Sequence, residues 1–383
     1  MKKALVHDWY TVYGGAERCV ESFTNIWSDF DHYSLIDNLS DNDRHTILKG
    51  KKTKNSFIQK LPFGKTKYRN YLPLFPLAIE QLDFRDYELV ISSSSSVAKG
   101  IITRPDQLHI SYVYSPMRYA WDLYHQYLKE ANLERGLKGL FAKYFLFKLR
   151  AWDYSTANRP DHYIAISNYV AARIKKIYNK EATVIYPPVD TESFTISDKV
   201  GDYYITCSRM VPYKKIDLIV EAFSKTDKKL IVIGDGPEFK KIKKLAKSNV
   251  QLLGFLGKEK MLELLKESKA FIFAAEEDFG IAPIEAQAAG VPVIAYGKGG
   301  ILETVNGAFW DEDEVVKSDI TGVFFQNQTT DSLIKAVNFF EKNKDKFDKN
   351  TIRNNALKFS KERFEIEFKL AIENIYINWK QNQ

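Results

Sequence analysis

The chain has only two cysteines among its 383 residues, Cys19 and Cys207. They lie far apart, each inside a regularly patterned segment, so they form no disulfide framework and we expect a reducing compartment. The six histidines are also scattered. Since no His or Cys cluster has the spacing of metal ligands, we predict no metal and no other cofactor.

Long apolar runs are absent as well. No stretch approaches the roughly 18 successive apolar residues that cross a bilayer, and residues 1–7 suit a short strand better than a secretory leader. We therefore expect a cytoplasmic protein that is soluble or peripheral to a membrane. A hydrophobic content of 45% is enough for full cores, and the length suits two domains.

Short apolar segments alternate with helical patterns along the whole chain, which is typical of parallel α/β layering. We expect strands at 3–7, 87–92, 109–115, 161–167, 182–186, 202–208, 229–234, 249–254, 270–275, 291–296 and 321–325. Pro187 and Pro188, followed by turn-forming residues, predict a linker. The sequence thus predicts an α/β fold of two doubly wound domains, 1–186 and 187–358, with a ligand cleft between them and a helical tail at 359–383.

Positive charge is concentrated in two segments of the first half. Residues 44–79 contain nine Lys or Arg and no acid, with aromatic residues and prolines between them, and residues 137–150 are basic and apolar. Such mixtures attract an anionic membrane surface or lipid head group, although a solvated charged face is the alternative. No nucleic-acid-binding motif accompanies the charge, so we predict no nucleic acid partner.

The most informative stretch runs from Glu277 to Glu285 and lies between an apolar segment and Gly290. Pro283 suits the first position of a helix and Gly290 its end, which would place Glu285 at the third helical position. Two carboxylates beside a helix N-terminus can hold a ligand with hydroxyl or anionic groups. From the spacing alone, a helix-capping Glu285 and a solvated Glu277 explain the pattern equally well.

Basic residues follow another predicted strand, with Arg209 and Lys214 between its end and the next helix. Two cations at the carboxyl end of a strand can converge on a phosphate. Together with the Glu277–Glu285 turn they form a constellation of cations for a diphosphate and carboxylates for sugar hydroxyls. In the first half, Gly14 and Gly15 let the backbone approach a ligand closely, or form a plain turn.

The second half resembles family 4 retaining glycosyltransferases of the GT-B fold, which have two Rossmann-like domains. The matching pieces are 185–190, 208–214, 234–238, 277–285 and 292–303, in the order that the family has them. Residues 7–18 and 115–122 add a similarity to the bacterial O-antigen and exopolysaccharide mannosyltransferases of that family. The resemblance implies that the first domain binds the acceptor and that the tail crosses back onto it.

The resemblance also implies roles for residues of the second half. Arg209 and Lys214 would neutralise the donor diphosphate, and Glu277 would position the transferred sugar. Glu285 would bind the nucleotide ribose. The backbone N–H groups that contact the sugar and phosphates would be those around Phe279, Gly280 and Ile281.

In the first half, the resemblance implies that Gly14 and Gly15 close on the diphosphate. Arg118 is a candidate contact to the acceptor or the sugar. Tyr114 stands where many relatives place a sugar-contacting histidine, and it either keeps a hydrogen bond to the donor or packs as an ordinary strand residue. A retaining transfer tolerates the change, because the departing phosphate oxygen can accept the acceptor's proton without a protein base.

The function that the resemblance implies is a retaining, metal-independent hexosyltransferase at the inner face of the cell membrane. It would move mannose from GDP-mannose onto a lipid-diphosphate-linked saccharide during bacterial surface polysaccharide synthesis. Two alternatives are a UDP-hexose donor and a catalytically silent protein that binds a sugar nucleotide or a lipid. A nicotinamide-dependent oxidoreductase is disfavoured, because the turn at 234–238 lacks the Gly-x-Gly-x-x-Gly spacing.

Overall fold

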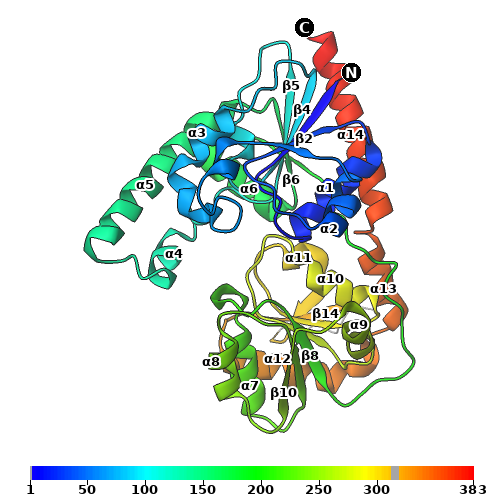
Figure 1. Cartoon of the computed structure of the whole chain (residues 1–383). Coiled ribbons are helices and arrows are strands. Elements are labelled where there is room, and N and C mark those ends of the chain that lie inside the picture. The colour runs from blue at the N-terminus through cyan, green and yellow to red at the C-terminus, as the bar shows by residue number, and fades with distance from the viewer. Residues whose placement is uncertain (1, 312–318) are drawn as a thin grey trace. The chain divides into compact units, whose positions relative to one another are not determined.

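The computed structural model describes residues 2–311 and 319–383, which divide into two compact units (Figure 1). Unit 1 comprises Met1–Pro188 and Phe364–Gln383, and unit 2 comprises Val189–Arg363. Each unit contains one seven-stranded sheet with helices around it, and all paired strands are parallel. The predicted α/β fold with two doubly wound sheets is confirmed, whereas the cleft between the domains stays a prediction.

The sheet of unit 1 has the order β3-β2-β1-β4-β5-β6-β7. Its strands are β1 Lys3–His7, β2 Asp31–Ser34, β3 Thr53–Asn55, β4 Leu89–Ser94, β5 Leu108–Val113, β6 His162–Ala165 and β7 Thr183–Val184. The chain runs outward from β1 to β3 and then returns to β4 on the other side of β1. The carboxyl ends of β1 and β4 therefore form the topological switch point of this sheet, the usual ligand edge in this architecture.

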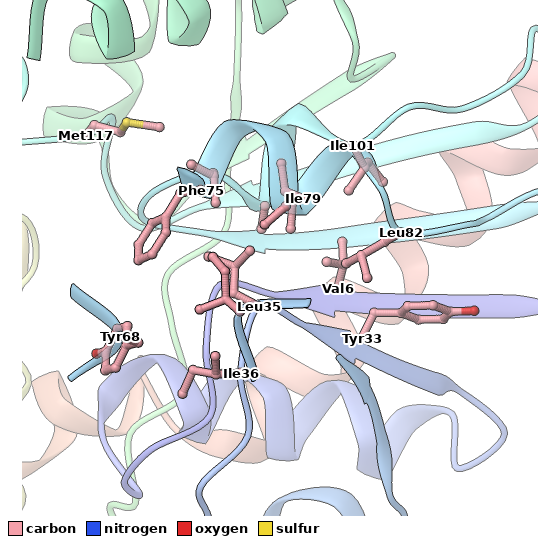
Figure 2. Packing of buried hydrophobic residues seen from close by; sticks show 14 of the residues in the cluster. Val6, Tyr33, Leu35, Ile36, Tyr68, Phe75, Ile79, Leu82, Ile101 and Met117 are labelled. Atoms are coloured by element: carbon pink, nitrogen blue, oxygen red, sulfur yellow. The ribbon is translucent and has the colours of Figure 1, made fainter. Parts of the chain in front are cut away.

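Helices cover both faces of the unit 1 sheet: α1 Gly15–Ile26, α2 Asp41–Leu48, α3 Phe75–Glu80, α4 Tyr124–Glu130, α5 Gly136–Ser155, α6 Asn168–Tyr178 and, from residue 364 on, α14 Lys361–Gln381. Short 3-10 helices lie between them at η1 Phe57–Lys60, η2 Tyr68–Leu74, η3 Ala98–Gly100 and η4 Thr156–Asn158. On one face, Val6 packs with Leu35, Phe75 and Ile79 in a cluster of buried residues (Figure 2).

The opposite face of this sheet binds α1 and α14 through aromatic residues. The ring of Phe23 lies 4.4 Å from that of Phe368 and 5.7 Å from that of Phe364. Tyr112 on β5 completes the cluster at 5.8 Å from Phe368. Each fully buried aromatic side chain stabilises the fold by about 1.5–3 kcal/mol, which anchors the C-terminal helix within unit 1.

The sheet of unit 2 has the order β10-β9-β8-β11-β12-β14-β13. Its strands are β8 Tyr204–Cys207, β9 Leu230–Ile233, β10 Val250–Gly254, β11 Phe271–Phe273, β12 Val293–Tyr296, β13 Gly307–Phe309 and β14 Gly322–Phe325. Its helices are η5 Pro212–Lys214, α7 Ile216–Ser224, α8 Phe239–Leu245, α9 Lys258–Lys266, α10 Ile281–Ala288, α11 Ile301–Thr304, α12 Thr330–Asn343, η6 Lys344–Lys346 and α13 Lys349–Leu357. Here the switch point lies between β8 and β11.

Three strands escaped prediction: β2, β3 and β13. Two of them, β3 and β13, are three residues long and lie at sheet edges, where one side of the strand is unpaired. In β2 the sequence Asp-His-Tyr-Ser contains no apolar run. His32, Tyr33 and Ser34 of β2 are nevertheless buried, so its position in the sheet is not evident from an apolar pattern.

Candidate functional site

The switch point of unit 2 brings two predicted site segments to one edge of one sheet. Arg209 follows the end of β8 by two residues, and Glu277 follows the end of β11 by four. Because β8 and β11 are parallel neighbours, their carboxyl ends meet at the same edge. Ligands of doubly wound sheets bind at this kind of edge.

The loop after β8 is held in place by two glycines of the next strand-to-helix turn. A Cβ atom at Gly234 would lie 2.0 Å from the Ser208 carbonyl oxygen, and one at Gly236 would lie 2.5 Å from the Met210 carbonyl oxygen. The Met210 N–H donates to the Asp235 carbonyl at 2.9 Å. The turn at 234–238 thus fixes the backbone on either side of Arg209, whose side chain is exposed.

Lys214 and Glu277, which are 63 residues apart in the chain, form an ion pair. Only 20% of the Lys214 side chain and 18% of the Glu277 side chain are exposed. The backbone of Glu277 is fixed by the Gly300 N–H, which donates to its carbonyl at 2.8 Å. Gly299 has a φ of +87°, and a Cβ there would lie 2.5 Å from the same carbonyl oxygen. The structure therefore places the predicted phosphate-binding cation beside the predicted sugar-binding carboxylate.

Helix α10 begins earlier than the sequence predicted. Gly280 is its N-cap with a φ of +93°, a left-handed conformation that favours glycine, and Ile281 is the first helical residue. Pro283 is consequently the third helical residue, and Glu285 is the fifth. The prediction of Pro283 at the first position was wrong because all N–H groups of the first turn lack helical partners, so proline is tolerated throughout it. Glu285 lies beyond that first turn, which removes helix capping as an explanation for it.

The Glu285 side chain is half-buried, and its negative charge acts on Cys207 at the end of β8. Burial, followed by the negative charge of Glu285, raises the pKa of the Cys207 thiol to about 11. Phe279, next to the N-cap, is only 3% exposed and packs its ring 5.6 Å from that of Phe359. Any contact of Phe279 with a ligand is therefore made by its backbone, and Ile281, which is half-buried, presents its N–H in the first turn.

In unit 1, Gly14 is the N-cap of α1 and Gly15 is its first residue. The Gly14 N–H donates to the Glu17 carboxylate at 3.1 Å, as in a capping box. The Glu17 carboxylate, which is buried, also lies 3.6 Å from Nε2 of His7. The two glycines thus begin the helix at the carboxyl end of β1, near a buried His–Glu pair that the sequence did not single out.

Tyr114 continues this polar cluster. Its hydroxyl donates to the Ala16 carbonyl at 3.0 Å and lies 2.7 Å from the Ser93 hydroxyl, which is itself 2.9 Å from Nδ1 of His7. Burial raises the pKa of the Tyr114 phenol. The tyrosine thereby connects β5 with the ends of β1 and β4. Arg118 is partly buried in the loop after β5, and its carbonyl accepts the Leu123 N–H at 2.8 Å.

Asp8 is a residue of this edge that sequence reasoning missed. Its buried carboxylate accepts the backbone N–H groups of residues 95–98 at 2.6, 2.9, 2.8 and 2.8 Å, together with the Ser95 hydroxyl. The available signal was an acid directly after a strand and the Ser92–Ser96 run. So many donors make Asp8 a structural anchor that shapes the loop after β4.

The predicted membrane segments also lie in unit 1, where part of the first is used internally. Arg44 pairs with Asp37 at 2.6 Å, Lys54 pairs with Asp31 at 3.3 Å, and Lys51 donates to backbone carbonyls. These cations thus also make contacts within unit 1, and the membrane association of segment 44–79 stays a prediction. The exposed cations in the later part of the segment are Lys60, Lys65, Lys67 and Arg69.

Among residues 2–311 and 319–383, no three His, Cys, Asp or Glu side chains are grouped so that they could hold a metal ion. In the same part of the chain, no helix has both the length and the apolar character needed to cross a membrane.

Comparisons with known proteins cover both units. Residues 13–193 match the family model described as Glycosyltransferase Family 4, and residues 191–358 match the one described as Glycosyl transferases group 1. An uncharacterized glycosyltransferase of Methanocaldococcus jannaschii, MJ1178, is 30% identical over 180 residues, which are 45% of this chain and 48% of that protein.

A second relative is the GDP-mannose-dependent monoacylated alpha-(1-6)-phosphatidylinositol monomannoside mannosyltransferase of Corynebacterium glutamicum. It is 32% identical over 175 residues, which are 37% of this chain and 46% of that protein. The chain thus spans about half the length of these curated relatives.

Solved structures match the chain nearly end to end. Anabaena HepE in complex with UDP-glucose has a TM-score of 0.65 at 16% identity and covers 98% of this chain and 100% of its own. Sucrose-phosphate synthase of Thermosynechococcus elongatus has a TM-score of 0.72 at 14% identity, covering 99% and 100%. The fold is therefore the two-domain α/β architecture of GT-B glycosyltransferases.

Proposed function

Because two glycosyltransferase domain models together account for residues 13–358, we propose that the protein is a retaining glycosyltransferase that takes its donor at the β8–β11 edge of unit 2. The observation that carries the proposal is the Lys214–Glu277 pair at that edge, with Arg209 and Glu285 on the adjoining loop and helix. Cations suit the diphosphate of a nucleotide sugar, and carboxylates suit the hydroxyls of its ribose and sugar.

The chemistry follows from where charge develops. As the bond between sugar and diphosphate breaks, negative charge grows on the departing phosphate, where Arg209 and Lys214 stabilise it. Glu277 holds the lysine in place and orients the sugar, while Glu285 binds the ribose. The backbone N–H groups at Gly280 and Ile281 add partial positive charge from the start of α10.

Retention of the sugar's configuration is consistent with this arrangement. If the acceptor attacks from the side of the departing phosphate, that phosphate oxygen takes the acceptor's proton, and no protein base is required. The charge on the diphosphate is neutralised by two side chains, so we propose that transfer needs no metal ion.

For the donor we propose GDP-mannose and transfer of mannose. Support comes from the mannosyltransferase of Corynebacterium glutamicum, whose name specifies GDP-mannose, and from a 23% identical alpha-1,3/1,6-mannosyltransferase of Candida glabrata. A UDP-hexose is the second candidate, because HepE, which shares the fold, was solved with UDP-glucose.

For the acceptor we propose a lipid-diphosphate-linked saccharide at the inner face of the cell membrane, extended during synthesis of a surface polysaccharide. The exposed cations of residues 60–69 and 137–150 support association with an anionic surface. Gly14, Gly15 and Arg118 belong to unit 1, for which we propose acceptor binding and closure on the diphosphate.

The test is a panel of GDP-mannose, UDP-glucose, UDP-galactose and ADP-glucose with a lipid-diphosphate saccharide acceptor, read by mass spectrometry and by NMR of the linkage formed. We expect a mannosylated product with an axial linkage, and a Glu285→Gln variant with little product. A product from a UDP-hexose alone would replace the donor assignment. Binding of a nucleotide without transfer from any donor would favour a silent binding protein.

A further inference from the structure

Helix α5 exposes apolar side chains where a helix on a protein surface normally carries polar ones. Its inner stripe is buried and includes Leu146 and Leu149. Its outer face exposes Leu137 by 79%, Leu140 by 65%, Phe141 by 63%, Tyr144 by 53% and Phe147 by 56%. Figure 1 shows α4 and α5 projecting from the rest of unit 1. A contiguous exposed apolar face of this kind marks an interaction site.

A groove lies between the inner side of α5 and the segment 70–76. It encloses about 480 Å³ and is lined mainly by apolar side chains, among them Leu72, Pro73, Pro76, Leu133, Phe145 and Trp152. This volume is within the range of cavities that hold small ligands. The groove belongs entirely to unit 1, and none of the proposed donor-site residues lines it.

The exposed charges of α5 itself are all positive. Four cations lie on α5, at Lys138, Lys143, Lys148 and Arg150, and Lys148 also lines the groove. The helix has a single acid, Asp153, which is buried and paired with Lys99 at 3.0 Å. Across the groove, the segment that contributes Asn70 carries the exposed Lys65, Lys67 and Arg69.

We propose that α5 docks unit 1 on an anionic bilayer, with its outer apolar side chains in the interface and a hydrocarbon chain of a membrane lipid in the groove. Aromatic and aliphatic side chains beside lysines suit the boundary between head groups and acyl chains. The exposed cations of α5 favour an anionic lipid, and the apolar lining of the groove accepts a hydrocarbon chain. The inference deepens the membrane association proposed above and uses residues separate from the transfer site.

The first experiment measures partition onto vesicles of phosphatidylglycerol and phosphatidylcholine. The variant Phe141→Ser/Phe147→Ser removes two exposed apolar side chains, and Ile377→Ser, 52% exposed on α14, is the matched control. We expect the double variant to partition at least about tenfold more weakly, with the control unchanged and all three proteins melting alike. Equal partition of the double variant and the wild type would overturn the proposal.

The second experiment tests the groove through Trp152, which lines it. Vesicles of phosphatidylglycerol with brominated acyl chains should quench tryptophan fluorescence in the wild type, and Trp152→Phe should lose most of the quenched component. Equal quenching in both proteins would show that no chain enters the groove. Quenching that appears only after a brominated lipid-diphosphate saccharide is added would assign the groove to the acceptor and overturn the choice of a membrane lipid.

Transfer to a water-soluble acceptor analogue separates this inference from the proposed function. Normal transfer by Phe141→Ser/Phe147→Ser with weakened vesicle binding supports both. If the wild type transfers no sugar but binds vesicles and shows quenching of Trp152, the proposed function is overturned and this inference is supported.

Discussion

Replacing Lys214 by methionine separates the two effects that this lysine has at the β8–β11 edge. Its ammonium group pairs with the Glu277 carboxylate, and about four fifths of each side chain is out of contact with water. Methionine keeps most of the side-chain volume and removes the charge. Glu277 then becomes a largely buried carboxylate without this cation.

The expected cost in stability follows from that burial. Removal of one partner of a fully buried ion pair costs about 3–5 kcal/mol, and residual exposure of both groups reduces this to roughly 2–3 kcal/mol. The expected cost in catalysis is separate. Loss of one group that stabilises transition-state charge lowers kcat by about 10²–10³, or roughly 2.7–4 kcal/mol.

The double variant Lys214→Met/Glu277→Gln distinguishes the two. Glutamine removes the negative charge that Glu277 would otherwise carry without a partner at position 214. We therefore expect the double variant to regain about 1–2 kcal/mol of unfolding free energy relative to Lys214→Met, while kcat stays low. Urea unfolding measures the first quantity, and initial rates at saturating donor measure the second. The control is Lys225→Met, which breaks a half-exposed pair with Glu221 and should change stability by less than about 1 kcal/mol.

Two results would refute this reasoning. Wild-type kcat in Lys214→Met would mean that the lysine does not meet the diphosphate. Recovery of kcat together with stability in the double variant would mean that Lys214 acts only by supporting the fold.

Four further predictions address other parts of the chain. Gly280→Ala should cost about 1–2 kcal/mol in urea unfolding, since its φ is +93°, and should lower kcat. Asp8→Asn should destabilise unit 1 by about 2–3 kcal/mol, because an amide group would face N–H donors. Burial lowers the pKa of His32 from 6.5 to about 4, so protonation of this histidine favours the unfolded chain. The free energy of unfolding should therefore be highest above about pH 6.5 and fall by up to about 3 kcal/mol toward pH 4. Urea titrations should show a weaker pH dependence for His32→Leu. Excess EDTA should leave the transfer rate unchanged if Arg209 and Lys214 neutralise the diphosphate, and a loss that Mg²⁺ restores would contradict this.

The sequence predicted the fold well where buried strands consist mainly of apolar residues. The central strands β1, β8 and β11 are apolar runs that the structure places within two residues of the expected ends. The edge strand β3 has the sequence Thr-Lys-Asn and gives no such signal. Its pairing with β2 depends on the surrounding unit, which local sequence does not encode.

The sequence predicted which residues belong to the candidate site, but it did not predict which of them contact each other. Lys214 and Glu277 were both selected from the sequence, but their pairing depends on β11 returning beside β8, which only the sheet order reveals. Likewise Asp8 binds a loop 87 residues away because β1 and β4 are neighbours. Pro283 misplaced the start of α10, since the left-handed Gly280 begins the helix two residues earlier than proline alone suggests.

The most direct test of the account is a crystal structure of the full chain with GDP, and with UDP as the comparison. We predict diphosphate oxygens within hydrogen-bonding distance of Arg209 and Lys214, and ribose hydroxyls on the Glu285 carboxylate. A nucleotide bound elsewhere, with the Lys214–Glu277 pair untouched, would contradict the central claim.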